Sequence, residues 1–310
     1  MIFSVEAWDP EYGTGGDVDA LDASTDVVHA DVEIPLDQWA PITPGEIEPS
    51  AEPGAIYFVD GVRRIDARVW VTDDGRVLPG TCATVAAGSV ACSPDAAVVH
   101  DVAVRRVFFT PPTPGATSIA TEFGEYEHVA IKTGSPEDLY LGIHEEMTSL
   151  ETQIVPAGGV NDLVVFDGPL RGRVGTRTVG LIKTQHVQYL DIDEQQVVTT
   201  LEPGQRSPLF TIGSRFSWYL RLPGPRTHGW AGIVRCESST NSDDINGAIA
   251  TAAALADRVS ATLPRYASEP HKEHRAPQNL YPIKGLENAL RRRLGDQRLL
   301  QRALRKASGD

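Results

Sequence analysis

The chain has 310 residues, of which 41% are hydrophobic and 23% charged, so it is long enough for one large domain or two ordinary ones around a buried core. It contains no run of eighteen apolar residues, and its N-terminus lacks the basic start and apolar core of a signal peptide, so we expect no membrane span and a cytoplasmic location. The three cysteines have no metal-type spacing, and their odd number does not indicate a disulfide framework.

Charge is distributed unevenly along the chain, although its formal sum is −14. Residues 1–50 contain twelve acidic residues and no Lys or Arg, whereas residues 284–306 carry eight basic residues against two acidic ones. Such asymmetry is more informative than the net charge, and it permits a polyanionic partner.

In chain order, residues 1–54 are acidic and rich in Pro and Gly, which predicts an extended, partly disordered N-terminal arm with one short helix. Residues 55–310 then form the folded domain. Its first runs, "AIYFVD", "RIDARVWVTDDG" and "GTCATVAAGSVACS", predict three strands. We expect a turn at Asp60-Gly61 between the first two and a hairpin turn at Asp73-Asp74-Gly75 between the last two.

Strand-like and irregular pieces continue through residues 97–131, and the remaining elements alternate between helix and strand. Residues 135–155 predict a helix that Ser135 caps and Pro136 begins, with a stripe of apolar residues at helical spacing. The later expectations are a strand at 161–168, a strand at 178–184, a helix at 191–201, a strand pair in "RFSWYLRLPG" and "GWAGIVRCES", a helix at 242–263, and one or two basic C-terminal helices.

Two predicted strands end in Asp-Gly, at Asp60 and at Asp167. Strand ends are where α/β proteins often place functional groups, and two neighbouring carboxylates favour protonation or a bound cation such as Mg²⁺ or Mn²⁺. Glu151 or Glu146, on the helix before the second strand, supplies a third carboxylate. The alternative is that each Asp-Gly is only a turn, since turns recruit these residues.

The order of three antiparallel strands, a helix and a further strand is that of a ribonuclease H-like fold. We therefore predict an α/β protein with a mixed sheet flanked by helices, an acidic N-terminal arm and basic C-terminal helices. In such folds the acids gather two metal ions about 4 Å apart, which support phosphodiester cleavage.

Five segments, in this order, resemble NurA-type nucleases, especially actinobacterial forms, over roughly residues 55–306. They are "FVDGVRR", "DLVVFDGPLRGR", "VGLIKTQ", "GIVRCES" and "RAPQNLYPIKGLENALRRRLGD". The resemblance implies a manganese-dependent DNA nuclease that processes DNA ends at double-strand breaks. It also implies a homodimer that works with a HerA-type hexameric translocase ATPase.

The resemblance assigns the site residue by residue. Asp60 matches the family's first acid and Asp167 its strand-ending acid, while Glu151 fits the helical acid better than Glu146 does. Glu287, opening the final helix, falls near a last metal-site residue that is often histidine. The implied cofactor is Mn²⁺ or Mg²⁺, as two ions per site.

Basic residues near Asp167 suit contact with DNA. Lys183 could neutralise a phosphate or orient the attacking water, and its alternative is an ordinary exposed lysine. Arg171, Arg173 and Arg177 lie in a Gly-rich loop where flexible cations suit phosphate contact, unless the loop is only solvated. His186, close to Lys183 in the chain, joins the DNA-binding set, although a structural role is the simpler interpretation.

Three further alternatives stay open. The protein is either the nuclease or a catalytically degenerate, ribonuclease H-like adaptor of the ATPase, and a weaker possibility is an α/β enzyme that uses paired acids on a sugar. The acidic arm either docks on a basic partner surface or shields the cleft from nonspecific DNA.

Overall fold

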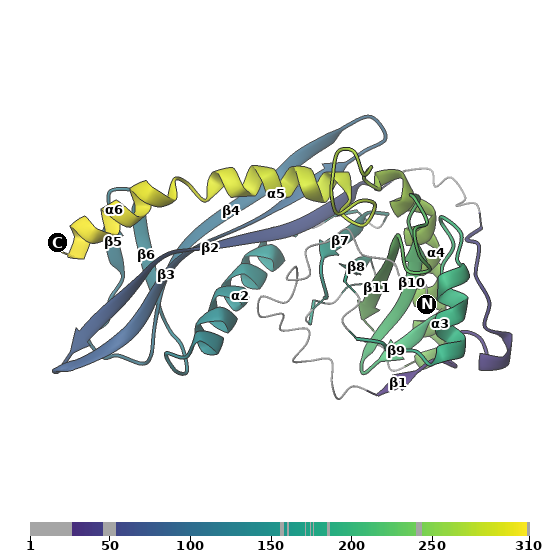
Figure 1. Ribbon diagram of the computed structural model, residues 1–310, viewed down its shortest axis with the longest axis horizontal. Helices are drawn as coiled ribbons and strands as arrows, with labels where there is room; N and C mark the ends of the chain where they lie inside the picture. The colour runs from purple at the N-terminus through teal and green to yellow at the C-terminus, as the bar shows by residue number, and fades with distance from the viewer. Residues whose placement is uncertain are drawn as a thin grey trace. The chain divides into compact units, whose positions relative to one another are not determined.

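The computed structural model describes residues 27–45, 54–155, 158–159, 161–170, 172–173, 175, 177–184, 187–239 and 244–308. Figure 1 shows their strands and helices, coloured by position along the chain. The strands are β1 Val28–His29, β2 Ile56–Asp73, β3 Arg76–Cys92, β4 Ala97–Thr110, β5 Ile119–Thr121, β6 Gly124–Ala130, β7 Leu163–Asp167, β8 Thr178–Ile182, β9 Phe210–Ile212, β10 Arg215–Arg221 and β11 Ile233–Ser239. The helices are η1 Leu36–Gln38, α2 Pro136–Gln153, α3 Ile192–Thr200, α4 Ile245–Thr262, η2 Leu263–Tyr266, α5 Tyr281–Arg293 and α6 Gln297–Ser308.

The chain divides into two compact units. The first unit comprises Met1–Phe58, Cys92–Ala96 and Gly158–Lys284, and the second comprises Val59–Ala91, Ala97–Ala157 and Gly285–Asp310. Strand β2 and helix α5 each begin in the first unit and continue into the second.

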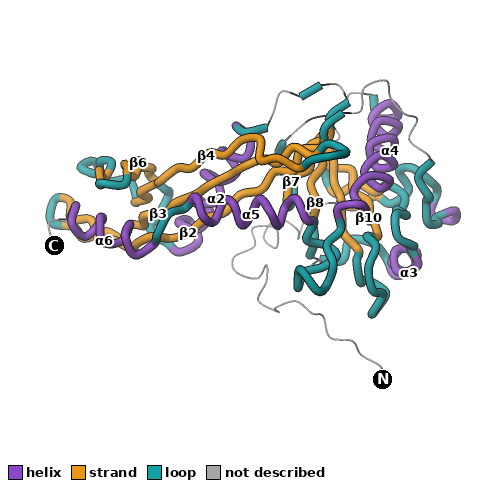
Figure 2. The backbone as a smooth tube through the Cα atoms, turned by 90° about the horizontal axis from the view of Figure 1, so that it is seen from above, coloured by secondary structure: helices purple, strands orange, loops and turns teal. Residues whose placement is uncertain are grey.

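The first unit has the strand order β1-β9-β10-β11-β8-β7, followed by the first residues of β2. The pairings from β1 to β8 are antiparallel, and β8 pairs with β7 in parallel. Helix α4 lies beside β10 in both views (Figures 1 and 2). Phe210 and Tyr219 stack with ring centroids 5.5 Å apart in a core that also buries Trp39 and Val198. Aromatic and branched side chains on alternating strand positions thus hold this sheet to its helices.

The described part of the predicted acidic arm, residues 27–45, supplies β1 and the 3-10 turn η1 to this unit. Glu33 forms a bidentate pair with Arg206, with both N···O distances 2.8 Å, and Asp257 contacts the Arg206 Nε at 2.6 Å. Burial lowers the pKa of the Arg206 guanidinium, but these two carboxylates outweigh it and raise the pKa. The Arg206 side chain is 2% exposed, so the two acids compensate a buried charge. Residues 1–26 and 46–53 of the predicted arm lie outside the described residues.

The second unit has the strand order β2-β3-β4-β6-β5. Every residue from Gly80 to Val90 of β3 is buried, which means that both faces of this strand are covered, because side chains alternate between the faces. Helix α5 covers one of them at Gly88, where an added Cβ would lie 3.0 Å from Leu286 Cδ1. Helix α6 packs beside β5, with Leu304 in a cluster with Phe108 and Tyr126 (Figure 1).

Several local predictions are confirmed. The hairpin turn lies where expected, with positive φ at both Asp74 (46°) and Gly75 (74°), the conformation of a type I′ turn. The Ser135 side chain accepts a hydrogen bond from the Asp138 N–H, and Pro136 begins α2. The predicted strand pair is β10 with β11, and the C-terminal block forms two helices.

The prediction of a turn at Asp60-Gly61 is wrong. Residues 56–73 form one unbroken strand, so Asp60 lies within β2 rather than at a strand end. The strand-like and irregular pieces predicted over residues 97–131 form β4 and the two short strands β5 and β6. The protein is a mixed α/β structure with a mostly antiparallel sheet and helices. No described helix has the length and apolar character needed to cross a membrane.

Candidate functional site

In the second unit, one of the predicted acids, Glu151, lies against β2 at Gly61, the residue after Asp60. A Cβ added to Gly61 would lie 2.6 Å from Met147 Cγ and closer still to Glu151 Oε1, so α2 approaches the strand backbone at the residue after Asp60. Side chains need about 3.5–4.0 Å between carbon atoms, which only glycine leaves here. The Glu151 carboxylate therefore lies against the β2 backbone one residue away from Asp60.

Both carboxylates are withdrawn from solvent. Asp60 is 9% exposed and Glu151 5% exposed, and Asp60 Oδ1 accepts the Gly61 N–H at 2.8 Å. Buried carboxylates need a compensating charge or hydrogen bonds, and their oxygens are the ligands that Mg²⁺ and Mn²⁺ prefer. The residues thus fit a hard cation in chemistry. Within the described ranges, however, no group of three or more His, Cys, Asp or Glu side chains is arranged to hold a metal ion.

The other two predicted metal ligands have basic partners. Glu146 Oε2 pairs with Arg105 Nη1 at 2.6 Å, and Glu287 Oε1 pairs with Arg291 Nη2 at 2.8 Å. Glu287 does not open the final helix, as the sequence suggested, because it lies inside α5 and α6 follows. Glu146 and Glu151 were the two candidates on α2 for the third acid, and Glu151 is the one that lies beside β2.

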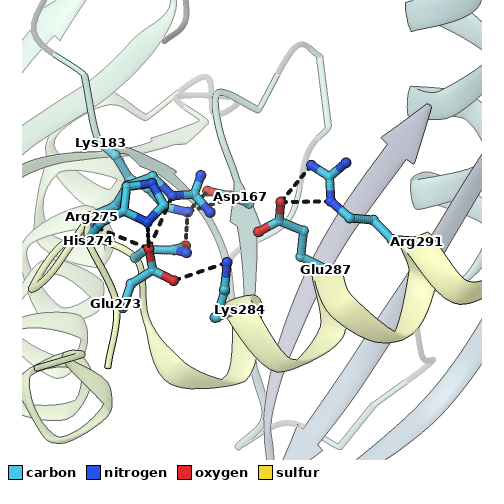
Figure 3. A network of polar contacts seen from close by, with 9 residues as sticks. Asp167, Lys183, Glu273, His274, Arg275, Lys284, Glu287 and Arg291 are labelled. Atoms are coloured by element: carbon cyan, nitrogen blue, oxygen red, sulfur yellow. Dashed lines mark hydrogen bonds and ion pairs between the residues drawn. The ribbon is translucent and has the colours of Figure 1, made fainter. Parts of the chain in front are cut away.

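In the first unit, Asp167 ends β7 as predicted, and Gly168 has a φ of +98°, which favours glycine. Lys183, just beyond β8, donates to Asp167 at 2.7 Å and to Asn279 Oδ1 at 2.8 Å (Figure 3). Lys183 is 7% exposed and Asn279 is fully buried, so Lys183 is not the ordinary exposed lysine of the alternative interpretation. An ammonium has three N–H donors, and this arrangement directs two acceptors at them.

A second acid lies in the same unit, in the segment between η2 and α5. Glu273 is 3% exposed and contacts the Lys284 Nζ at 3.1 Å and the Arg275 N–H at 3.0 Å (Figure 3). Burial raises the pKa of the Glu273 carboxyl, but the Arg275 N–H and the Lys284 ammonium outweigh it and hold the pKa below its usual range. Glu273 therefore stays ionised and fixes the start of the segment that delivers Asn279.

The predicted DNA-binding arginines are tied to the protein itself where they are described. Arg173 Nη1 donates to the Pro169 carbonyl at 3.1 Å, and its guanidinium lies 4.4 Å from the centroid of the Phe166 ring. Arg177 Nη2 reaches the Gly158 carbonyl at 3.5 Å. Arg171 and His186 lie outside the described residues.

Sequence reasoning missed two buried polar residues next to Asp167. Glu237 of β11 is fully buried, accepts the Leu170 N–H at 2.6 Å, and pairs with Arg235 Nη1 at 3.0 Å. It thereby holds the loop that follows Asp167. Asn279 accepts a hydrogen bond from Lys183 and thereby holds the Lys183 ammonium in place. An acid inside the apolar run "IVRCE" was the available signal for Glu237.

Comparison with solved structures finds two nucleases among the similar chains. The NurA nuclease from Sulfolobus solfataricus has a TM-score of 0.48 and 11% identity, with 86% of this chain and 88% of that chain covered. An endonuclease V from Bacillus subtilis has a TM-score of 0.25 and 12% identity, with 76% and 79% covered. The sequence matches no family profile and no curated protein.

Proposed function

We propose that the protein is a divalent-metal-dependent DNA nuclease of ribonuclease H-like fold. The observation that supports this function most is the approach of α2 to β2, which brings the buried Glu151 carboxylate to the residue beside the buried Asp60. Carboxylate oxygens are the ligands that Mg²⁺ and Mn²⁺ prefer, so these two acids suit a divalent cation.

In this proposal the cofactor is Mn²⁺ or Mg²⁺, as two ions in the manner of two-metal nucleases. The acids that the sequence assigns to it are Asp60, Glu151 and Asp167, with Glu146 and Glu287 as weaker candidates. When bound, such ions lower the pKa of water and offset charge on the phosphate that is cleaved. Lys183 keeps an N–H donor for a phosphate oxygen, since Asp167 and Asn279 accept from the others. Arg171, Arg173, Arg177 and His186 are assigned to the DNA backbone.

The biological setting is proposed from the resemblance in sequence. The substrate is a DNA end, hydrolysed during double-strand break processing, and the protein acts in the cytoplasm as a homodimer with a HerA-type hexameric ATPase. The segments quoted for that resemblance contain Asp60, Lys183, Glu237 and Asn279, which are buried, and the partly buried Asp167.

The direct test is cleavage of end-labelled linear DNA in Mn²⁺, with and without the ATPase. We expect the wild type to cleave, chelation to stop it, and Asp60→Asn and Asp167→Asn to reduce cleavage to background. Asp74→Asn is the matched control, because Asp74 is an exposed hairpin residue at positive φ, which Asn tolerates. Cleavage that survives in both site variants would exclude the proposed site.

The alternative is a degenerate adaptor that binds the ATPase and DNA without cleaving. Two observations favour it. Lys183 already neutralises Asp167, and side chains alternate along a regular strand, which directs Asp60 and the Gly61–Glu151 approach to opposite faces of β2. A protein that binds the ATPase, cleaves nothing under either condition and takes up no Mn²⁺ would be the adaptor.

A further inference from the structure

Helix α6 presents three arginines on the side opposite its buried face. Leu300, Ala303 and Leu304 are its buried residues, whereas Arg298, Arg302 and Arg305 are exposed. At 100° per residue, the three arginines fall within about 60° of arc, centred opposite the buried residues. We call Arg298, Arg302 and Arg305 the α6 arginine face.

The second unit holds this face in a fixed place. Arg64 donates to the carbonyls of Leu294 at 3.0 Å and Gly295 at 2.8 Å, which ends α5 at a glycine with a φ of +80°. Asp296 then caps α6 by accepting the N–H groups of Arg298 and Leu299. Capping at both sides of the turn and burial of Leu304 hold α6 against the second unit.

Acidic partners for the α6 arginine face are absent among the residues that the structure describes. None of the three side chains forms an ion pair or a hydrogen bond there, although the neighbouring Arg291 pairs with Glu287. Other arginines of the same unit are paired, such as Arg64 with Asp66 and Arg105 with Glu146. In a chain with a net charge of −14, a concentrated cationic stripe without acids marks a surface for an anionic partner.

We propose that the α6 arginine face binds the phosphate backbone of duplex DNA, independently of sequence. From Arg298 to Arg305 the helix rises about 10 Å, which matches about three phosphates along one strand. Guanidinium groups suit phosphate oxygens because their planar donors bind two at once. An anionic membrane is a poorer partner, because the apolar side of α6 is buried in the protein and is not available for insertion.

This inference rests on the proposed nuclease function for its choice of DNA, but its test requires no catalysis. Binding of a fluorescent 30-base-pair duplex of arbitrary sequence is measured by anisotropy in EDTA over a range of salt concentrations. The test variant is R298Q/R302Q/R305Q. The control variant R68Q/R76Q/K132Q also removes three exposed charges from the second unit. Thermal unfolding of both variants checks that they fold.

We expect the test variant to bind roughly tenfold more weakly or worse, with its slope of log affinity against log salt reduced by about 3, while the control keeps the wild-type slope. Equal slopes in the wild type and the test variant would overturn the inference, as would a wild type that does not bind the duplex. Two other outcomes would also overturn it. In the first, the test variant loses binding to anionic vesicles but keeps its binding to DNA. In the second, the test variant and the wild type bind DNA equally once residues 1–26 are deleted, which would make the acidic N-terminal segment the partner. If the test variant keeps both its nuclease activity and the wild-type salt slope, the inference about α6 fails while the proposed nuclease function remains supported.

Discussion

Replacement of Gly61 by alanine is the sharpest structural prediction. The new Cβ would lie 2.6 Å from Met147 Cγ, about 1 Å inside normal carbon contact, and would also displace the Glu151 carboxylate. Met147 Cγ is close to the α2 backbone, so the helix itself must move. Overpacking of this kind costs about 1–3 kcal/mol, and the entropy gained by removing a glycine returns about 0.4–1 kcal/mol. We expect a net loss of about 1–2 kcal/mol in the free energy of unfolding.

Chemical and thermal unfolding measure this loss, which corresponds to a fall in Tm of roughly 1.5–3 °C for a chain of this length. Gly45→Ala is the control, since no atom lies within 4 Å of the added Cβ, and it should change stability by less than about 0.5 kcal/mol. Shortening Met147 to alanine in the Gly61→Ala background should recover part of the loss, because the two sites are coupled through one contact. Equal stability of Gly61→Ala and the wild type would refute the close approach of α2 to β2, and with it the placement of Glu151.

Three further predictions concern buried charge in the first unit. Glu33→Ala leaves Arg206 with Asp257 alone and should lower the unfolding free energy by about 3 kcal/mol. The control Asp37→Ala, at an exposed residue, should lower it by less than about 0.5 kcal/mol. Equal losses in the two variants would contradict the buried ion pair. Asn279→Ala removes an acceptor from Lys183 and should cost about 1.5–3 kcal/mol and slow DNA cleavage, whereas the exposed Asn288→Ala should do neither. The folded state lowers the pKa of Glu273, so the carboxylate stabilises the fold above the unfolded pKa of about 4.3 and loses this contribution as pH falls through the folded pKa. The difference in unfolding free energy between the wild type and Glu273→Gln should therefore close in acid. A difference that is constant with pH would refute this prediction.

The sequence predicted the elements whose signals are local. The Asp74-Gly75 turn needs positive φ, which only a few residue types accept, and the Ser135-Pro136 start of α2 depends on neighbours within one helical turn. The two Asp-Gly pairs show where local signals fail. Gly168 is a true turn glycine with a φ of +98°, but Gly61 lies inside β2 and is glycine because α2 approaches it. The same dipeptide has two physical causes, and only tertiary structure separates them.

The residues of the candidate site also fall into those with a local signal in the sequence and those without one. Asp167 was predictable because it ends a predicted strand, whereas Lys183 was singled out through the family resemblance; their side chains lie 2.7 Å apart. Asn279 and Glu237 were not singled out, since their contacts reach 96 and 67 residues along the chain to Lys183 and Leu170. A buried polar residue takes its role from its partner, and no periodic pattern in one sequence identifies that partner.

Titration of the metal-free protein with Mn²⁺ by calorimetry tests most directly whether the buried acids form a metal site. The wild type, Asp60→Asn, Glu151→Gln and the control Asp74→Asn are compared, with folding checked by thermal unfolding. The nuclease proposal predicts that the wild type and the control bind Mn²⁺ and that both site variants lose a binding step. Equal binding by all four proteins, or none by the wild type, would contradict it and leave the adaptor as the function of this chain.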